Sequence, residues 1–190
     1  PSLYESYRDR YVCCSMCVCY FCGLCMSICR LTFFGFYRYC FVKPAQRCYE
    51  LMIQRSTQRK TFGRFLWEHG SLQRDIATSF AEIQQARLLT LHCAHSMDTY
   101  GPKQSRQLIS SIKVAVPQLC MNVIDRALQV FGGAGVSQDF ILASAWANMR
   151  TLRIADGPDE VHRRTVALKE IKKYLASSQK TSKQQQPRKR

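Results

Sequence analysis

Apolar side chains recur every three or four positions along the chain from Ala45 onward, which is the spacing of amphipathic helices. This spacing predicts helices over residues 45–58, 67–97, 108–130, 139–149 and 158–175. The third repeat is unbroken, so we expect that helix to be the most buried. No alternating pattern of useful length predicts a strand. Long helices with short connections predict an all-α fold, an up-down antiparallel bundle.

Glycine and proline mark where these helices are expected to end or bend. Gly132–Gly135 follows the third helix and is a typical stop signal. Pro117 lies inside the third helix and should kink it, unless a local distortion absorbs the ring. Pro158 suits the first position of the last helix, where Asp159 and Glu160 would face the positive end of the helix dipole.

The N-terminal segment has a different composition, since residues 11–29 contain no charged side chain and many cysteines. The length just suffices for a membrane span, although cysteine is only mildly apolar and basic residues flank both ends. Cys14 and Cys17 form one of several overlapping C-x-x-C pairs, but the apolar residues between them and the lack of a nearby histidine disfavour zinc. The abrupt change near Pro44 also fits an incorrect exon junction or a truncated transcript.

Three regions are therefore predicted. Residues 1–44 form a Cys-rich apolar N-terminal segment, expected to be a helical extension poorly packed on the bundle. Residues 45–176 form the helical bundle. Residues 177–190 carry five basic residues, no acidic residue and no large apolar side chain, so we expect a disordered, solvated tail rather than a nucleic-acid or localisation patch.

Charge and cysteine usage narrow the function classes. The net charge is +15, and the moderately basic residues 44–176 are consistent with anionic ligands such as pyrophosphates. Eleven cysteines, nine of them between Cys13 and Cys48, do not form the even, spread set of a secreted disulfide framework. Cys93 and Cys120 are predicted core residues. His92 and His95 lack an acidic partner, so no metal site is predicted, and no nucleic-acid partner is expected.

The strongest chemical signal is a glycine turn followed by a carboxylate. Gly132 and Gly133 let a backbone approach a ligand closely, with Gln129 beside them. Asp156 follows about twenty residues later, just before the last helix. A carboxylate there suits proton transfer or helix capping, and we favour proton transfer.

Three motifs in order and spacing resemble the C-terminal helical domain of the acyl-CoA dehydrogenases. They are Arg59-Lys-Thr-Phe-Gly63, Gln129-Val-Phe-Gly-Gly-Ala-Gly135 and Ile154-Ala-Asp-Gly157. The wording Gly-Gly-Ala-Gly-Val-Ser-Gln-Asp and Ala-Asp-Gly-Pro-Asp-Glu-Val-His is most similar to the branch of family members ten and eleven. The resemblance covers residues 45–175, about two-thirds of the chain.

The resemblance implies an FAD cofactor and an acyl-CoA substrate. It assigns cofactor contacts to the following residues: Arg59, Thr61, Phe62, Gln129, Gly132 and Gly133. In the family the arginine reaches the FAD of the neighbouring subunit, which implies a homo-oligomer formed through the bundle. Asp156 would be the base that removes the α-proton of an acyl-CoA thioester while the β-hydrogen leaves as hydride to the flavin.

The match also has departures. The family base is usually glutamate, and Ala155 replaces the usual tyrosine before it. Pro158 and Glu160 replace a threonine and a glutamine that usually touch FAD, so cofactor contacts there are not assigned.

The resemblance further implies a mitochondrial or peroxisomal enzyme of fatty-acid β-oxidation. The N-terminal helical domain and the middle β-domain of the family have no counterpart in this sequence, so we expect a truncated or partial chain, inactive alone. The alternative is a non-catalytic helical oligomerisation module, tethered to a membrane through residues 11–29.

Overall fold

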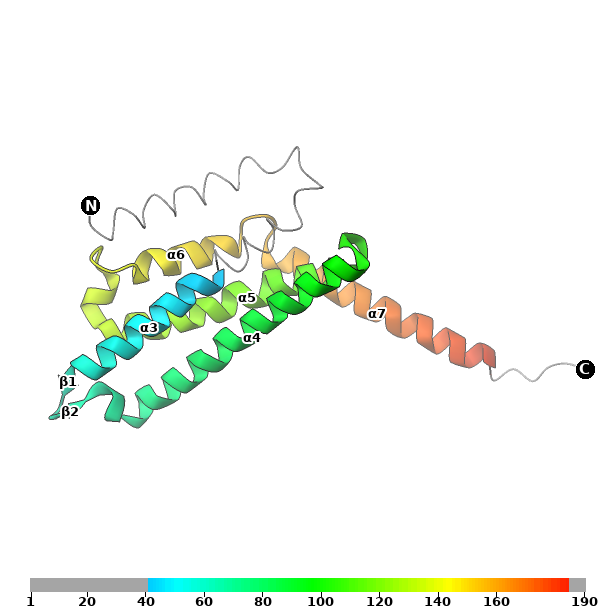
Figure 1. Ribbon diagram of the computed structural model, residues 1–190. Helices are drawn as coiled ribbons and strands as arrows, with labels where there is room; N and C mark the ends of the chain where they lie inside the picture. The colour runs from blue at the N-terminus through cyan, green and yellow to red at the C-terminus, as the bar shows by residue number, and fades with distance from the viewer. Residues whose placement is uncertain (1–40, 185–190) are drawn as a thin grey trace, which may run out of the picture.

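The computed structural model describes residues 41–184, with side chains through residue 178, and shows an antiparallel helical bundle (Figure 1). Its helices are α3 (Lys43–Gln58), α4 (Gly70–Tyr100), α5 (Pro102–Phe131), α6 (Leu142–Leu152) and α7 (Asp159–Gln184). The last of these packs on α5 and then extends beyond the bundle (Figure 1). The predicted all-α bundle is confirmed.

Helix α5 is the centre of the bundle, because it packs against α3, α4, α6 and α7. It carries more buried residues than any other helix in the described part of the chain, as its unbroken apolar repeat predicted. Gly101, with φ of 80°, joins α4 to α5, and Pro102 begins α5 at a position that needs no amide donor. The helix continues through the buried Pro117, so the predicted kink is absorbed, although Pro117 cannot donate to the carbonyl of Lys113.

The bundle begins earlier than the predicted boundary at residue 44. Phe41 and Val42 are both almost fully buried and belong to the hydrophobic core. Two large apolar side chains in the core make these residues part of the bundle and not of an extension. The cysteine-rich residues 1–40, with the proposed membrane helix and the C-x-x-C pairs, lie outside the described residues.

The other end also differs from expectation. Helix α7 continues to Gln184, so residues 177–184, expected to be disordered, are helical. Glutamine and lysine are good helix formers, and no glycine or proline occurs between Asp159 and Pro187, so nothing in this part of the sequence ends the helix. The end of α7 was predicted from the end of its apolar repeat. That repeat indicates which residues pack on the bundle, and a helix can continue beyond the residues that pack.

The prediction of no sheet was wrong in one short segment. Lys60–Thr61 (β1) and Arg64–Phe65 (β2) pair as an antiparallel hairpin between α3 and α4. Two-residue strands are too short to show an alternating pattern, so periodicity could not reveal them. The 3-10 helix η2 (Leu66–Glu68) then leads into α4, which starts at Gly70 rather than Trp67.

Within the described residues, one helical stretch, Pro102–Val136, is long and apolar enough to cross a membrane by length and composition. It contains the central helix of the bundle, and 44% of its most apolar window is buried inside the protein. Its role in core packing accounts for its apolar character.

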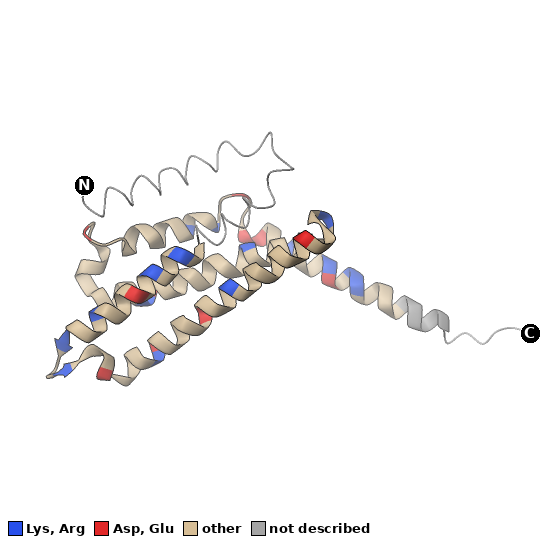
Figure 2. Cartoon of the chain, viewed as in Figure 1, with Lys and Arg blue, Asp and Glu red and all other residues tan. Residues whose placement is uncertain are grey.

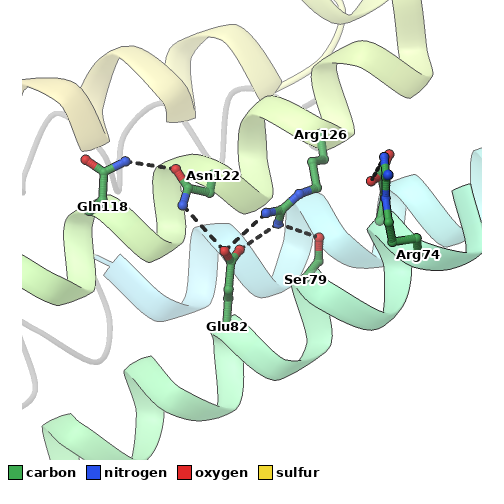
Figure 3. Close-up of polar contacts among 7 residues, drawn as sticks. Arg74, Ser79, Glu82, Gln118, Asn122 and Arg126 are labelled. Atoms are coloured by element: carbon green, nitrogen blue, oxygen red, sulfur yellow. Dashed lines mark hydrogen bonds and ion pairs between the residues drawn. The ribbon is translucent and has the colours of Figure 1, made fainter. Parts of the chain in front are cut away.

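A polar network crosses between α4 and α5 inside this apolar setting (Figure 3). Arg126 on α5 donates to both carboxylate oxygens of Glu82 on α4, at 2.6 and 3.1 Å, and to Ser79 Oγ at 3.2 Å. Asn122 donates to Glu82 at 3.4 Å and accepts from Gln118 at 2.8 Å. The hydrogen bond to Glu82 raises the pKa of Arg126. This bidentate pair fixes the register of the two longest helices.

Removing the cation from this network should destabilise the fold. Arg126→Met leaves Glu82, whose side chain is only 13% exposed, without its main partner. We expect the free energy of unfolding to fall by about 1–3 kcal/mol in urea denaturation. Arg47→Met is the matched control, since Arg47 and Glu50 form a half-exposed pair within one helix. Its effect should stay below about 0.5 kcal/mol, and equal losses in the two variants would contradict the proposed role of the network.

Three free thiols contribute to the core, one from each of the first three described helices. Cys48, Cys93 and Cys120 are all buried. Burial raises the pKa of Cys48 and Cys120 to about 12 and that of Cys93 to about 11, from an ordinary value of 9.0. The thiols therefore remain protonated in the folded chain under conditions that ionise them in the unfolded chain.

This difference makes stability depend on alkaline pH. Below pH 9 a thiol is protonated in both states; between pH 9 and about 12 only the unfolded state loses the proton of Cys120, so folding stability falls as pH rises. The free energy of unfolding of the wild-type chain should fall more steeply than that of Cys120→Ala, by about 1.4 kcal/mol per pH unit well above pH 9. Urea titrations at several pH values measure both slopes, and the comparison cancels other titrating groups. Parallel slopes would refute the prediction.

Candidate functional site

Two non-glycine residues have a left-handed backbone in the described part of the chain, and both are predicted site residues. Phe62 has φ of 51° and Asp156 has φ of 55°. Each precedes a left-handed glycine, Gly63 at 80° and Gly157 at 96°. A left-handed conformation costs a non-glycine residue about 1–3 kcal/mol and persists only where its surroundings hold it, commonly at functional sites.

Phe62 occupies the tip of the β1–β2 hairpin. The two-residue connection has positive φ at both positions, which is the type I′ turn that matches the twist of short hairpins. The Phe62 side chain is 98% exposed, so it packs on nothing in the described chain. Thr61, by contrast, is partly buried, and its hydroxyl lies 3.4 Å from His69 Nε2.

The hairpin that carries this exposed aromatic ring is rich in basic residues. Arg59, Lys60 and Arg64 are all exposed, and Figure 2 shows the basic residues gathered at the hairpin. Lys60 Nζ lies 4.4 Å from the centre of the Phe65 ring. No acidic residue occurs between positions 59 and 67. A basic tip carrying an unpacked aromatic ring can bind a phosphate and stack on a base.

The glycine turn lies where α5 ends. Gly132, with φ of 63°, ends the helix and starts the 3-10 helix η3 (Gly132–Val136). Exposed Gln129, Gly132 and Gly133 line an open concavity of about 370 Å³, together with Asp125, Leu128 and Val136.

The glycines of this turn serve different purposes. A Cβ at Gly132 or Gly133 would meet no atom within 4 Å, so bare backbone faces open space there. At Gly135 a Cβ would lie 2.9 Å from the Leu128 carbonyl oxygen, so that glycine is required for packing. Only the first two are available for close approach of a ligand.

The hairpin and the glycine turn lie at the same end of the bundle (Figure 1). The Arg55 guanidinium near the end of α3 lies 5.6 Å from the ring centre of Phe131 at the end of α5. Asp156 lies beyond the far end of α6, whose eleven residues span about 16 Å. The structure thus gathers the six predicted cofactor residues at one end and separates the predicted base from them.

The structure does not support the capping alternative for Asp156. The residue is exposed, and helix α7 starts three residues later at Asp159. Within the described chain, Asp156 forms a hydrogen bond through its backbone carbonyl, which lies 3.2 Å from His162 Nε2. Its carboxylate accepts no hydrogen bond there, and its negative charge acts on Lys113.

Sequence reasoning missed three charged residues next to Asp156. Asp159 and Lys113 are each only 3% exposed. Arg153 Nε donates to Asp159 Oδ2 at 2.7 Å. Burial lowers the pKa of Lys113, while the negative charges of Asp156 and Asp159 act in the opposite direction. The available signal was a lysine inside the apolar run Ile112–Val116, where a solvated charge is not expected.

The described residues contain no group of three histidine, cysteine or acidic side chains able to hold a metal ion. His92 and His95 are exposed on α4, whereas Cys93 between them is buried. These three side chains therefore do not share a face.

Comparison with known proteins shows what this arrangement resembles. The sequence model of the acyl-CoA dehydrogenase C-terminal domain matches residues 36–170. The chain is 48% identical over 132 residues to the probable acyl-CoA dehydrogenase IBR3 of Arabidopsis thaliana, covering 70% of this chain and 16% of that protein. It is 50% identical over 127 residues to acyl-CoA dehydrogenase family member 11 of Rattus norvegicus, covering 67% and 16%.

A solved structure supports the same relationship. A putative acyl-CoA dehydrogenase from Mycobacterium abscessus superposes with a TM-score of 0.69 at 45% identity, covering 70% of this chain and 33% of that chain. The predicted similarity to the branch that includes member eleven is confirmed. The chain spans 16% of the length of the two curated relatives.

Proposed function

The chain belongs to the acyl-CoA dehydrogenase family through its C-terminal domain, and from this premise we propose that it contributes to FAD-dependent α,β-dehydrogenation of acyl-CoA thioesters. The observation that carries the proposal is the conformation of Phe62 and Asp156. These are the two strained non-glycine residues of the described chain, and the family resemblance assigns one to the cofactor and the other to the reaction.

The residues at the hairpin end fit the nucleotide half of FAD. The guanidinium of Arg59 can donate to pyrophosphate oxygens in pairs, and the free ring of Phe62 offers a surface for stacking. In the concavity, Gln129 and bare backbone at Gly132 and Gly133 allow close hydrogen bonding to a neutral group. Asp125 on the same wall disfavours phosphate and can accept from a hydroxyl or amino group, as the adenosine half would require. When bound, the flavin would accept the β-hydrogen as hydride.

Asp156 is the proposed base. Its carboxylate has no hydrogen-bonding partner among the described residues, and the residue is exposed to solvent. It would accept the α-proton of the thioester at a carboxylate oxygen. Aspartate is one methylene shorter than glutamate, so the substrate must approach the backbone more closely. Exclusion of water by a bound substrate would strengthen the base.

The separation of the two ends supports the proposal of a homo-oligomer. Because α6, about 16 Å long, lies between the glycine turn and Asp156, one chain presents its cofactor residues and its base at different places. In our proposal, Arg59 and Gln129 serve the FAD of a neighbouring subunit while Asp156 serves the site of its own. Exposed apolar residues on α4, such as Phe80 and Leu88, provide surface for such contacts.

A chimera tests this function. Residues 41–176 would replace the matching third of the Mycobacterium abscessus protein, and acyl-CoA thioesters of different chain length would be added to the purified, flavin-loaded chimera. We expect the flavin absorbance to bleach. Asp156→Asn should slow bleaching by about 10²- to 10⁴-fold with flavin content unchanged, because only the proton acceptor is lost.

The controls separate the roles of the residues. Arg59→Gln should lower flavin content, whereas Asp98→Asn, an exposed carboxylate at the end of α4, should change neither flavin content nor rate. The 190-residue chain alone should neither retain FAD nor reduce it, because no described element encloses a flavin ring. An active Asp156→Asn chimera would refute the assigned base. A flavin-loaded chimera that never bleaches would favour the non-catalytic oligomerisation module.

A further inference from the structure

The segment that carries Asp156 is closed by a double link between its two ends. Arg153 Nε donates to Asp159 Oδ2 at 2.7 Å, and the Asp159 amide donates to the Arg153 carbonyl at 3.2 Å. One link is a charge-assisted side-chain bond and the other is a backbone bond, so together they fix distance and orientation. Residues 153–159 therefore form a closed loop, with Asp156 at its midpoint.

Lys113 binds the residue that immediately precedes this loop. It projects from the middle of α5, is almost fully buried, and donates through Nζ to the carbonyl of Leu152, the last residue of α6. The last carbonyls of a helix lack partners within the helix, so a cation there satisfies one and matches the negative end of the dipole. Desolvating an ammonium group is costly, and this site compensates with that carbonyl and two nearby carboxylates.

Asp159 depends on this arrangement of cations. Its side chain is buried, and its Oδ1 atom has no hydrogen-bond partner in the described structure. Arg163 reaches the other oxygen only at 3.7 Å. The charge of Asp159 is therefore balanced chiefly by Arg153, with Lys113 as the buried cation acting on the same loop.

The loop also fixes the backbone on both sides of the base. His162 Nε2 lies 3.2 Å from the Asp156 carbonyl oxygen, and a Cβ at Gly157 would lie 3.3 Å from the same nitrogen. The left-handed conformation of Asp156 is thus held between a closed loop, a buried lysine and a histidine of α7. The cost of that conformation is offset by contacts formed entirely within this domain.

We propose that Lys113, Arg153 and Asp159 are positioning residues that hold Asp156 in its left-handed, outward conformation. This inference rests on the proposed function of Asp156 as the base, and it adds that the helical domain preforms the geometry of the base before cofactor or substrate binds. None of the three residues touches the substrate in this scheme. They act through the loop.

Amide hydrogen exchange in the 190-residue chain tests the proposal. The Asp159 amide donates to the Arg153 carbonyl across the loop and reports its closure, whereas the amides of Ile154 and Ala155 donate to the Thr151 carbonyl of α6 and report the helix end from which the loop starts. Lys113→Met keeps most of the unbranched side chain but removes its charge, and Asp159→Asn keeps the shape of the carboxylate. Both variants should speed exchange at these amides by roughly tenfold or more, with the core amides of Val123 and Ala127 unchanged. The backbone chemical shifts of Asp156 should move away from left-handed values.

Matched controls make the same substitutions at exposed positions away from the loop. Lys103→Met lies exposed at the start of the same helix, and Asp98→Asn lies exposed on α4; neither should alter loop exchange. Arg153→Lys, which retains a cation, should preserve more protection than Arg153→Gln. Unchanged exchange at the loop amides in both Lys113→Met and Asp159→Asn would overturn the proposal, as would equal acceleration of loop and core amides. If one variant does not fold, the other decides.

A second readout separates positioning from the proposed function itself. In the chimera, Lys113→Met should lower kcat by roughly tenfold or more with KM and flavin content nearly unchanged, since misplacing a reacting group weakens the reaction and not ground-state binding. Equal losses in kcat and flavin content would contradict a positioning role. The exchange measurement requires no activity, so a chimera that fails because the proposed function is wrong leaves the loop result intact.

Discussion

Burial of α5 on several sides is the constraint on which the rest of this structure depends. Ile112, Val116, Val123 and Ile124 have no solvent exposure, and full burial of each such side chain contributes about 1.5–3 kcal/mol. The other four described helices all pack against this one, so it covers part of the apolar face of each. Charged groups on the packed faces of α5 are paired, as Arg126 is with Glu82.

The same helix links the structural core to both candidate ligand regions. Its C-terminal end carries Gln129 and the glycine turn, and its middle carries Lys113 beneath the Asp156 loop. Pro117 lies one turn after Lys113 and leaves the Lys113 carbonyl without its usual helical donor. Because the glycine turn and Lys113 are both on α5, this helix can hold the two regions at a fixed distance and orientation, which a site assembled from mobile loops could not do.

Strain and charge are concentrated at the proposed functional positions. Phe62 and Asp156 have left-handed backbone conformations that cost free energy, and both residues are exposed to solvent. Their supports differ. The hairpin turn supports Phe62 through backbone pairing, whereas the loop of Asp156 depends on Lys113 of α5, Arg153 just after α6 and Asp159 of α7. The proposed base therefore depends more strongly on the packing of the whole bundle than the proposed cofactor contacts do.

The sequence by itself determined the helices, their order and the motifs, because helical periodicity and the effects of glycine and proline are local. It also placed Arg59 and Asp156 on connections between helices, where a bundle exposes backbone, and Gln129 at the C-terminal end of a helix, just before the glycine turn. It did not reveal the hairpin, whose strands are too short to show a period, nor the helical continuation to Gln184, which has no apolar repeat.

Only the tertiary structure decided which residues meet across the chain. Lys113 and Asp159 are 46 positions apart, and no local pattern brings a lysine of one helix beneath the start of another. Aspartate adopts a left-handed backbone more readily than most residues, but the contacts that close the loop around Asp156 are set by the tertiary structure. The burial of Phe41 and Val42 was also decided by the tertiary structure, because burial is a property of the packed bundle. Periodicity determines which face of a helix is buried, but the partners that cover that face and the charges trapped beneath it are set by packing.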